Sequence, residues 1–359
     1  MNNAIECKTG ELASILRTLI ELRMACMIWG GPGIGKSEVI AQVALSLTYP
    51  MIDTRLSQIE QVDLRGIPDV DKATGKTKWM TPEFFPTAGE GIWLFDELTS
   101  ATPSVLAATY QLFNDRMLGE YNVPADWRLI AAGNREGDGG VTYKMPAPLG
   151  NRFVHLYVRA DANDWVDSYA NPMGVDPRIV AAVRSGFLAT GGEKQESAVY
   201  HFDRANAAFL TPRSLAKCSK VLDAMPESSM ARKTIICGLI GLGHGSELCA
   251  YLDMQAEFPS LDAIRKDPKS IAVPHSPSVA YAVACAMGRT LDINTVQADF
   301  TYLKRITSSD GHELREYRML VAQDVIARVS KSGEFKNSAI AGHPVFKREL
   351  CELAPYMSL

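Results

Sequence analysis

A glycine-rich loop near the amino terminus carries the residue types that bind a polyphosphate. Residues 30–37 read G-G-P-G-I-G-K-S and match the pattern G-x-x-x-x-G-K-[ST]. Glycines let the backbone wrap so that successive N–H groups point inward. Lys36 would bring a positive charge to the β and γ phosphates, and the Ser37 hydroxyl would coordinate Mg²⁺. The predicted nucleotide site consists of Gly30, Gly31, Pro32, Gly33, Ile34, Gly35, Lys36 and Ser37.

The segments on either side of this loop favour a strand before it and a helix after it. Residues 25–29 are an apolar run typical of a buried strand, and residues 38–45 can begin a helix. A helix that starts at the loop adds the positive end of its dipole where a phosphate would bind. A plain glycine-rich turn could have the same composition, but the order of strand, loop and helix favours nucleotide binding.

Two acidic residues follow another apolar segment further along the chain. Residues 91–95 read G-I-W-L-F, which is typical of a buried parallel strand, and Asp96 and Glu97 come directly after them. Ligands bind at the carboxyl ends of parallel strands. Asp96 is therefore expected to hold Mg²⁺, and Glu97 to orient or deprotonate an attacking water. An apolar run before two acids is common by itself, and the phosphate loop upstream favours the catalytic interpretation.

Two further polar residues stand next to apolar segments. Asn134 follows a predicted strand at residues 127–133, where its amide could hydrogen-bond both a γ-phosphate oxygen and a water. An ordinary turn asparagine is the alternative. Arg152 lies between a loop and the apolar segment 153–156, and taken alone it is best read as a salt-bridge partner.

Other elements of the first half would position these residues. Apolar side chains at helical spacing predict an amphipathic helix over residues 9–22, and residues 50–55 read as the next strand of an α/β sheet. Thr102 and Pro103 predict the start of another helix, because threonine is a good N-cap and proline suits the first helical position.

A long insertion separates the strand at 50–55 from the strand at 91–95. Residues 61–90 are rich in turn formers, and residues 71–76 predict the tip of a hairpin. A loop of this length is usually functional or flexible. The insertion is either a solvated hairpin or a segment that touches substrate, with Trp79 as an aromatic contact.

The second half of the chain predicts mainly helices. Asp176 with Pro177 caps one helix, residues 241–245 indicate close helix packing or a helix end, and residues 259–277 look like a connector before three or four more helices. An apolar stripe that is ordinarily core is formed by Leu314, Tyr317, Val321 and Val325.

Composition narrows the class of protein. A chain of 359 residues predicts two or three domains, and a net charge of −4 gives no overall attraction to nucleic acid or to anionic membranes. The seven cysteines are scattered, without a C-x-x-C pair, and are expected to be reduced and mostly buried. No apolar stretch is long enough to span a bilayer, and no histidine pattern indicates a metal site. We expect a cytoplasmic protein.

Taken together, these motifs resemble those of the AAA+ ATPases. The segment D-L-R-G at residues 63–66, the loop 137–143 and the L-G-N-R-F segment at 149–153 are similar to the MoxR branch, and the likeness extends over about residues 9–225. The resemblance implies an α/β fold with a parallel sheet flanked by helices. It implies three parts: a nucleotide-binding core with the insertion (1–158), an α-helical lid (159–257) and a helical C-terminal extension (258–359).

The resemblance also assigns a role to each motif. The phosphate loop would be Walker A, Asp96 and Glu97 would be Walker B, and Asn134 would be sensor 1. Arg152 would be the arginine finger that reaches the nucleotide of a neighbouring subunit, although Gly150-Asn151 stands before it where an acidic residue is more usual. Arg213, in the segment T-P-R-S, would be the arginine of sensor 2.

The function implied is Mg²⁺-dependent ATP hydrolysis by a homo-oligomer, a hexameric ring that remodels or activates a protein partner in a chaperone-like manner. In the MoxR branch such a partner often carries a von Willebrand A-type domain. The alternative is a motor or loader that acts on nucleic acid, since the same ATPase core serves both. The acidic charge balance and the lack of a basic, aromatic stripe disfavour that alternative.

Overall fold

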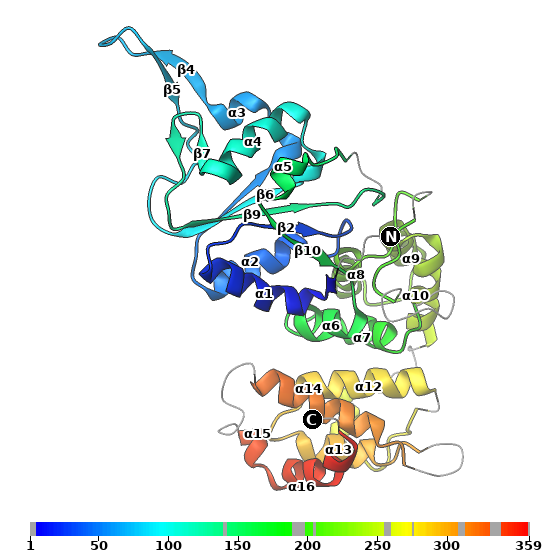
Figure 1. Ribbon diagram of the computed structural model, residues 1–359. Coiled ribbons are helices and arrows are strands. Elements are labelled where there is room, and N and C mark those ends of the chain that lie inside the picture. The colour runs from blue at the N-terminus through cyan, green and yellow to red at the C-terminus, as the bar shows by residue number, and fades with distance from the viewer. Residues whose placement is uncertain are drawn as a thin grey trace. The chain divides into compact units, whose positions relative to one another are not determined.

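The computed structural model describes residues 5–138, 142–188, 198–203, 206–254, 260–274, 276–307, 313–330 and 339–357 (Figure 1). The described residues form two compact units. The first, which we call the sheet unit, contains the chain up to Asp161 together with residues 202–205 and 211–213. The second, which we call the helical unit, contains residues 162–201, 206–210 and 214–359. The finer division of the helices into a lid and an extension stays a prediction.

A six-stranded sheet forms the centre of the sheet unit, and each neighbouring pair of its strands is parallel. This arrangement confirms the predicted α/β class. The apolar runs found in the sequence are its inner strands, since a strand buried on both faces needs apolar side chains on both. In spatial order the strands are β1 (Glu6–Cys7), β10 (Val154–Val158), β2 (Cys26–Trp29), β9 (Trp127–Gly133), β6 (Gly91–Asp96) and β3 (Met51–Arg55).

Helices cover both faces of this sheet. Figure 1 shows α1 (Thr9–Glu21) and α2 (Lys36–Ser46) on one face, with α4 (Pro103–Asp115) and α5 (Ala147–Gly150) on the other. A chain of aromatic contacts fills the core on the α4 side: the ring of Phe95 lies 5.2 Å from that of Phe113. The helix predicted at Pro103 is present, but the Thr102 hydroxyl contacts Ser104 and makes no cap hydrogen bond.

The insertion contains more regular structure than its sequence predicted. It begins with a short helix, α3 (Gln61–Arg65), and continues as an antiparallel hairpin of β4 (Ile67–Val70) and β5 (Thr77–Met80) with its turn at the predicted tip. Gly66 joins α3 to β4 at a φ of 84°, and a Cβ atom there would lie 2.0 Å from the Met80 carbonyl oxygen. Only glycine fits at this junction. A second hairpin follows α4, formed by β7 (Met117–Leu118) and β8 (Tyr121–Asn122).

The helical unit contains the helices of the second half of the chain. Asp176 caps α7 as predicted, since its carboxylate accepts from the Arg178 backbone N–H. The first helices are α6 (Ala162–Trp165), a π-helical turn (Val166–Ala170), α7 (Pro177–Arg184), α8 (Pro212–Ala224), α9 (Met230–Ile240) and α10 (Leu242–Met254). The remaining ones are α11 (Leu261–Lys266), α12 (Pro277–Thr290), α13 (Val296–Leu303), α14 (Glu316–Ser330), α15 (Ala339–Gly342) and α16 (Pro344–Leu353).

Two expectations for this part of the chain were wrong. The described part of the segment 259–277 is not a plain connector, because α11 lies within it, and the described residues that follow form five helices where three or four were expected. Gly245 agrees with the prediction of close helix packing, since a Cβ atom there would lie 2.5 Å from the Cys237 backbone.

The cysteine prediction agrees with the structure. No helix in the described ranges is long and apolar enough to cross a membrane. All seven cysteines are free thiols, and five of them are buried: Cys7, Cys26, Cys218, Cys249 and Cys285.

Candidate functional site

The phosphate loop connects β2 to α2 at the carboxyl edge of the sheet. Its backbone needs glycine at two positions, because Gly33 has a φ of 75° and Gly35, which precedes α2, has a φ of 104°. Gly33 is also constrained by space: a Cβ atom there would lie 2.9 Å from the Thr211 hydroxyl oxygen. The predicted strand, loop and helix are therefore present, with the loop closely packed against a segment far away in the sequence.

Lys36 points into the loop and is almost fully buried, with 8% of its surface exposed. Its ammonium group donates to the carbonyl oxygens of Gly30 (2.6 Å) and Gly31 (3.1 Å), and to the side-chain oxygen of Asn134 (2.9 Å). Burial lowers the pKa of Lys36 to about 8, against the opposing effect of Asp96. A phosphate oxygen could replace these neutral acceptors and would stabilise the charged form more strongly.

Ser37 and Asp96 meet at the end of β6. The Ser37 hydroxyl donates to one carboxylate oxygen of Asp96 at 2.6 Å, and the other carboxylate oxygen accepts from the Glu97 backbone N–H at 2.8 Å. Mg²⁺ prefers hard oxygen ligands at about 2.1 Å in octahedral geometry, so that neighbouring ligands are about 3 Å apart. A hydroxyl and a carboxylate at this separation fit that chemistry, and a bound cation would replace their hydrogen bond while the serine hydroxyl keeps its proton.

Glu97 follows Asp96 with a left-handed backbone, at a φ of 57°, which is uncommon for a residue other than glycine. Its carboxylate accepts a hydrogen bond from the Ser57 hydroxyl. Ser57 lies in a 3₁₀ turn (Leu56–Gln58) directly after β3, the neighbour of β6 in the sheet. Sequence reasoning missed Ser57, although a polar residue beyond the carboxyl end of a strand is the signal that found Asp96 and Asn134.

Asn134 is held in place by a second residue that the sequence did not indicate. The buried Thr99 hydroxyl accepts from the Asn134 backbone N–H at 3.1 Å and donates to the Asn134 carbonyl at 3.2 Å. Both backbone groups of Asn134 are therefore fixed, which leaves its side-chain amide directed at Lys36. The amide nitrogen remains available to a phosphate oxygen or a water.

Asp53 adds a further carboxylate on the β3 side of this site. Burial raises the pKa of Asp53, and the negative charges of Asp96 and Glu97 raise it further, while Arg55 lowers it. The Arg55 guanidinium lies 3.9 Å from the Asp53 carboxylate. The strand ends thus concentrate negative charge where a divalent cation is expected.

Arg213 joins the site through its backbone. Its N–H donates to the Gly33 carbonyl at 3.2 Å, and its positive charge is one of the influences that lower the pKa of Lys36. Its side chain is exposed. Arg213 and the phosphate loop belong to the same unit, so the predicted sensor 2 arginine is brought to the loop within one chain.

Arg152 is the predicted site residue that the fold does not bring to the phosphate loop. It is exposed and lies between α5 and Val154, the first residue of β10. Because β10 runs parallel to β2, Arg152 lies at the amino edge of the sheet, whereas the phosphate loop lies at the carboxyl edge. A strand of five residues separates the two edges by about 16 Å, at about 3.3 Å per residue.

The segment that contains this site is similar to a known protein family. Residues 25–153 match the AAA domain of the dynein-related subfamily, a range that includes the phosphate loop, Asp96, Glu97, Asn134 and Arg152. Midasin of Giardia intestinalis is 26% identical over 152 residues, which are 39% of this chain and 3% of midasin. Midasin of Dictyostelium discoideum is 26% identical over 152 residues, which are 39% of this chain and 2% of that protein. The chain therefore spans a small fraction of the length of these relatives.

Solved structures that align with most of this chain have low sequence identity to it. NtrX of Brucella abortus is 15% identical, with 90% of this chain and 69% of that chain covered and a TM-score of 0.39. RuvB of Thermotoga maritima, a Holliday junction branch migration motor, is 15% identical, with 87% of this chain and 93% of that chain covered and a TM-score of 0.38. From the site and the family match together, residues 25–153 form a P-loop ATPase domain similar to the AAA domain of the dynein-related subfamily.

Proposed function

We propose that this ATPase hydrolyses ATP with Mg²⁺ in a hexameric ring and uses the turnover to remodel or activate a protein partner. The observation that carries the proposal is the 2.6 Å contact between the Ser37 hydroxyl and the Asp96 carboxylate. A nucleotide-binding module without hydrolysis would not need a cation site next to Glu97 and Asn134. Mg²⁺ bound there supplies charge neutralisation at the β and γ phosphates.

The residues of one chain divide the chemistry among them. Lys36 binds the phosphate oxygens, and Ser37 and Asp96 hold the cation. Glu97 orients the attacking water or accepts its proton. Asn134, held by Thr99, orients the water or the γ-phosphate. The nucleotide itself is fixed by the backbone of the loop and by the start of α2.

One positive charge for the transition state comes from a second subunit. Arg152 lies at the amino edge of the sheet, opposite the edge that carries the phosphate loop of its own chain. In a head-to-tail ring the amino edge of one subunit can face the nucleotide of the next, because such an interface is heterologous. An arginine supplied in this way contributes about 10³ to 10⁵ in rate in related systems.

A protein partner is favoured over nucleic acid by the charge of the chain, which carries 41 acidic and 37 basic residues. Non-specific binding to a phosphate backbone depends on an excess of positive charge. Following the MoxR-like resemblance, we propose a partner with a von Willebrand A-type domain. Capture by the Glu97→Gln variant in ATP, with ADP as the control, tests this. Salt-dependent stimulation of turnover by DNA or RNA would favour the nucleic-acid alternative.

Mixing two inactive variants tests the shared site. Arg152→Ala and Glu97→Gln should each abolish turnover while keeping ATP binding. In mixed rings, a site from the Arg152→Ala subunit can receive the arginine of a Glu97→Gln subunit. Random mixing in equal amounts completes about one interface in four, so about a quarter of wild-type turnover should return if sites act independently.

The matched control mixes Lys36→Ala with Glu97→Gln. Both changes lie in the same half of the site, so no interface is complete and no activity should return. Equal recovery in both mixtures, or concentration-independent turnover by a wild-type monomer, would contradict the proposal.

A further inference from the structure

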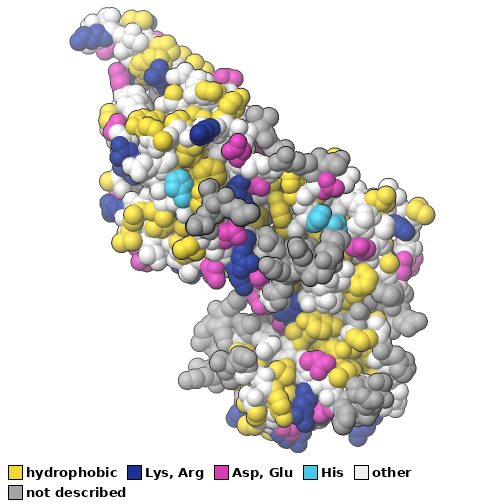
Figure 2. Space-filling view, turned by 45° about the vertical axis from the view of Figure 1, so that its right-hand side comes forward, with side chains coloured by type: hydrophobic (Ala, Val, Ile, Leu, Met, Phe, Trp, Pro, Cys, Tyr) yellow, Lys and Arg dark blue, Asp and Glu magenta, His cyan; other side chains and the backbone are white. Residues whose placement is uncertain are grey.

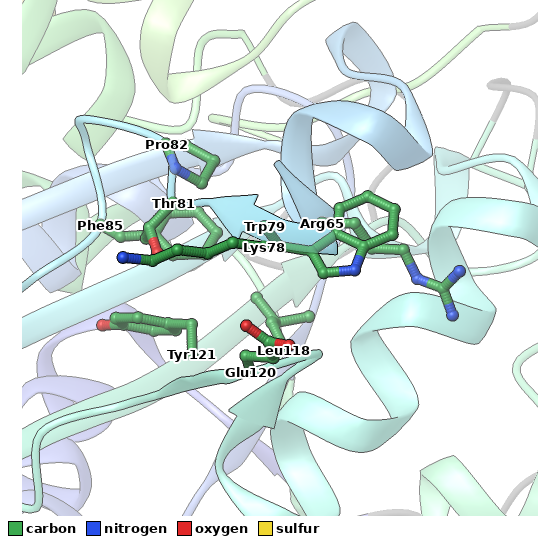
Figure 3. A pocket seen from close by; sticks show the side chains of 9 residues that line it. All are labelled: Arg65, Lys78, Trp79, Thr81, Pro82, Phe85, Leu118, Glu120 and Tyr121. Carbon is green, nitrogen blue, oxygen red and sulfur yellow. The ribbon is translucent and has the colours of Figure 1, made fainter. Parts of the chain in front are cut away.

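A hollow lies in the sheet unit outside the nucleotide site, between β5 and the β7–β8 hairpin (Figure 3). Its volume is about 180 Å³. Since liquid water occupies about 30 Å³ per molecule, it has room for about six waters. Pockets for nucleotides and other small-molecule cofactors are larger, about 300 Å³ or more. The hollow therefore suits one large side chain.

Aromatic rings that cannot move freely form the inner wall of the hollow. The ring of Phe85 is 3% exposed and lies 4.8 Å from the ring of Tyr121 and 4.9 Å from that of Trp93. The Tyr121 hydroxyl donates to the carbonyl of Pro86, and burial raises the pKa of Tyr121 to about 12, so the hydroxyl stays a neutral donor. Buried Leu118 completes this apolar wall.

Two cations stand at opposite ends of the hollow. Figure 3 shows the Lys78 ammonium at one end and the Arg65 guanidinium at the other, with the Trp79 ring between them. Both charged side chains are exposed, and neither head group makes an ion pair or hydrogen bond with any residue that the structure describes. Glu120 lies across the hollow from Trp79, so negative charge is disfavoured at the centre and favoured at the ends.

The two hairpins also offer backbone hydrogen bonds. Within the described ranges β5 pairs only with β4, and β8 pairs only with β7, so each two-stranded sheet has an unpaired edge. An extended peptide can add to such an edge through main-chain bonds while its side chains enter neighbouring pockets. The insertion also carries exposed apolar side chains outside the lining of the hollow: Ile67 is 70% exposed, Met80 54% and Phe84 40%. Figure 2 shows such hydrophobic side chains along the hairpin and at its base.

We propose that this hollow binds an extended segment of the client polypeptide in which an aromatic or large aliphatic residue is flanked by acidic residues. The apolar side chain lies between Trp79 and the ring of Tyr121, and the two carboxylates pair with Lys78 and Arg65. This deepens the proposed function, because the client is the protein partner named there. A nucleic-acid strand fits less well, since Glu120 repels phosphate and one small hollow does not follow a phosphate backbone.

Peptide binding to the full-length protein tests the site without requiring turnover. The probes are two short, unstructured, fluorescently labelled peptides, one with Phe between Asp residues and one with Phe between Lys residues. Fluorescence anisotropy should show at least tenfold tighter binding of the Asp-flanked peptide by the wild type. Trp79→Ala should weaken that binding at least tenfold, because a buried aromatic contact is lost.

Matched variants on the same hairpin test whether binding depends on the residues that line the hollow or only on the overall hydrophobicity and charge of the insertion. Met80→Ala removes an exposed apolar side chain outside the hollow and should leave affinity within twofold. Arg65→Glu with Lys78→Glu should invert the preference towards the Lys-flanked peptide. Lys72→Glu with Lys76→Glu makes the same charge change at the hairpin turn and should not invert it.

Peptide binding can be measured separately from ATP turnover, so a failure of this proposal can be distinguished from a failure of the proposed function. ATP turnover measured on the same samples reports on the nucleotide site, and the hairpin variants should leave it unchanged in the absence of peptide. Failure of the wild type to bind either peptide, equal binding of both, or unchanged affinity after Trp79→Ala would overturn the proposal. Tighter binding of a single-stranded oligonucleotide than of the Asp-flanked peptide would overturn it as well.

Discussion

The hydroxyl of Ser57 donates a hydrogen bond to the carboxylate of Glu97, so that a residue at the end of β3 fixes the side chain that follows β6. The two strands are neighbours in the sheet, and Glu97 has a left-handed backbone at this point. The position of the carboxylate is therefore determined both by its own backbone and by a side chain from the adjacent strand end.

Removing the Ser57 hydroxyl should reduce turnover. Hydrogen bonds to charged groups contribute about 1.5 to 3 kcal/mol, so loss of this one should lower kcat by about tenfold or more through misplacement of Glu97. Ser57→Ala should leave the KM for ATP unchanged, and Ser57→Thr should retain activity because it keeps a hydroxyl. Steady-state ATPase assays distinguish these cases, and an unchanged or increased kcat in Ser57→Ala would show that Ser57 does not position the carboxylate.

ATP affinity should fall as the pH rises. Burial lowers the pKa of Lys36 to about 8 in the nucleotide-free protein, so the ammonium loses its proton above that pH, while a bound phosphate would keep it charged. Linkage then predicts about tenfold weaker binding at pH 9 than at pH 7. Calorimetry across this range measures the change. Lys36→Arg stays charged and should show no such loss, and a flat profile for the wild type would contradict the assignment.

The dependence of ATP turnover on free Mg²⁺ should show whether Ser37 is a ligand of the cation. Ser37→Ala removes one of the two proposed protein ligands, and we expect turnover to require about tenfold more free Mg²⁺, in the range seen when metal sites lose a supporting group. A titration of ATPase activity against free Mg²⁺ measures this. Ser46→Ala, on the same helix but bonded to the Val43 carbonyl, is the control and should behave as wild type. Identical Mg²⁺ curves for both variants would argue against a cation at Ser37.

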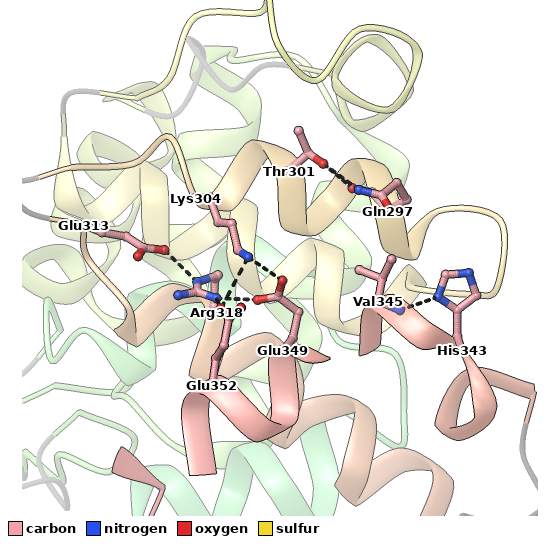
Figure 4. A network of polar contacts seen from close by, with 9 residues as sticks. All are labelled: Gln297, Thr301, Lys304, Glu313, Arg318, His343, Val345, Glu349 and Glu352. Atoms are coloured by element: carbon pink, nitrogen blue, oxygen red, sulfur yellow. Dashed lines mark hydrogen bonds and ion pairs between the residues drawn. The ribbon is translucent and has the colours of Figure 1, made fainter. Parts of the chain in front are cut away.

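A buried charge cluster in the helical unit should control stability without affecting the nucleotide site (Figure 4). Arg318 and Glu349, which are 3% and 1% exposed, form an ion pair, and Lys304 lies 2.7 Å from the second oxygen of Glu349. Glu349→Leu removes the buried carboxylate that pairs with both Arg318 and Lys304, while Glu313 and Glu352 still contact Arg318, and should cost about 3 kcal/mol of unfolding free energy. Arg318→Met combined with Glu349→Leu should recover most of that loss, as measured by urea unfolding of the full chain.

Glu352 in the same cluster gives a matched comparison. Its side chain is 45% exposed, so Glu352→Gln should cost at most about 1 kcal/mol. The hydrogen bond from Arg318 lowers the pKa of Glu352, which means that its contribution is present at neutral pH and is lost as the pH falls through the lowered value. The difference in stability between Glu352→Gln and wild type should therefore vanish in acid. A larger loss for Glu352→Gln than for Glu349→Leu would contradict this ranking.

The strands could be predicted from the sequence because their apolar runs are continuous. In β6, for example, both faces of the strand are buried, so nearly every side chain must be apolar. It could not predict Ser57 or Thr99, because their roles depend on which strand ends are neighbours, and strand order is a property of the whole sheet. The helix α3 was missed because five residues with one buried side chain, Leu64, give no periodic signal. Arg318 was missed because a charged residue beside an apolar stripe normally faces solvent.

Arg152 and the phosphate loop lie at opposite edges of the sheet because β10 and β2 are parallel. In a parallel sheet, a residue before one strand and a loop after another must lie at different edges. The order of the motifs in the sequence does not by itself show this, because it does not say at which edge of the sheet each motif lies. Within the range that matches the AAA domain, the residues proposed to act inside one chain lie at the carboxyl edge of the sheet. Arg152, which is proposed to act on a neighbouring chain, lies at the amino edge.

The hydrogen bond from the Arg213 N–H to the Gly33 carbonyl joins a peptide group of the phosphate loop to one in the first turn of α8. This helix has 13 residues, about 20 Å in length, and continues from Arg213 into the helical unit. A phosphate that turned the Gly33 peptide would disturb the hydrogen bonding at the origin of a rigid rod. The phosphate loop and the first hydrogen bonds of α8 are thus connected through backbone groups alone, inside the sheet unit.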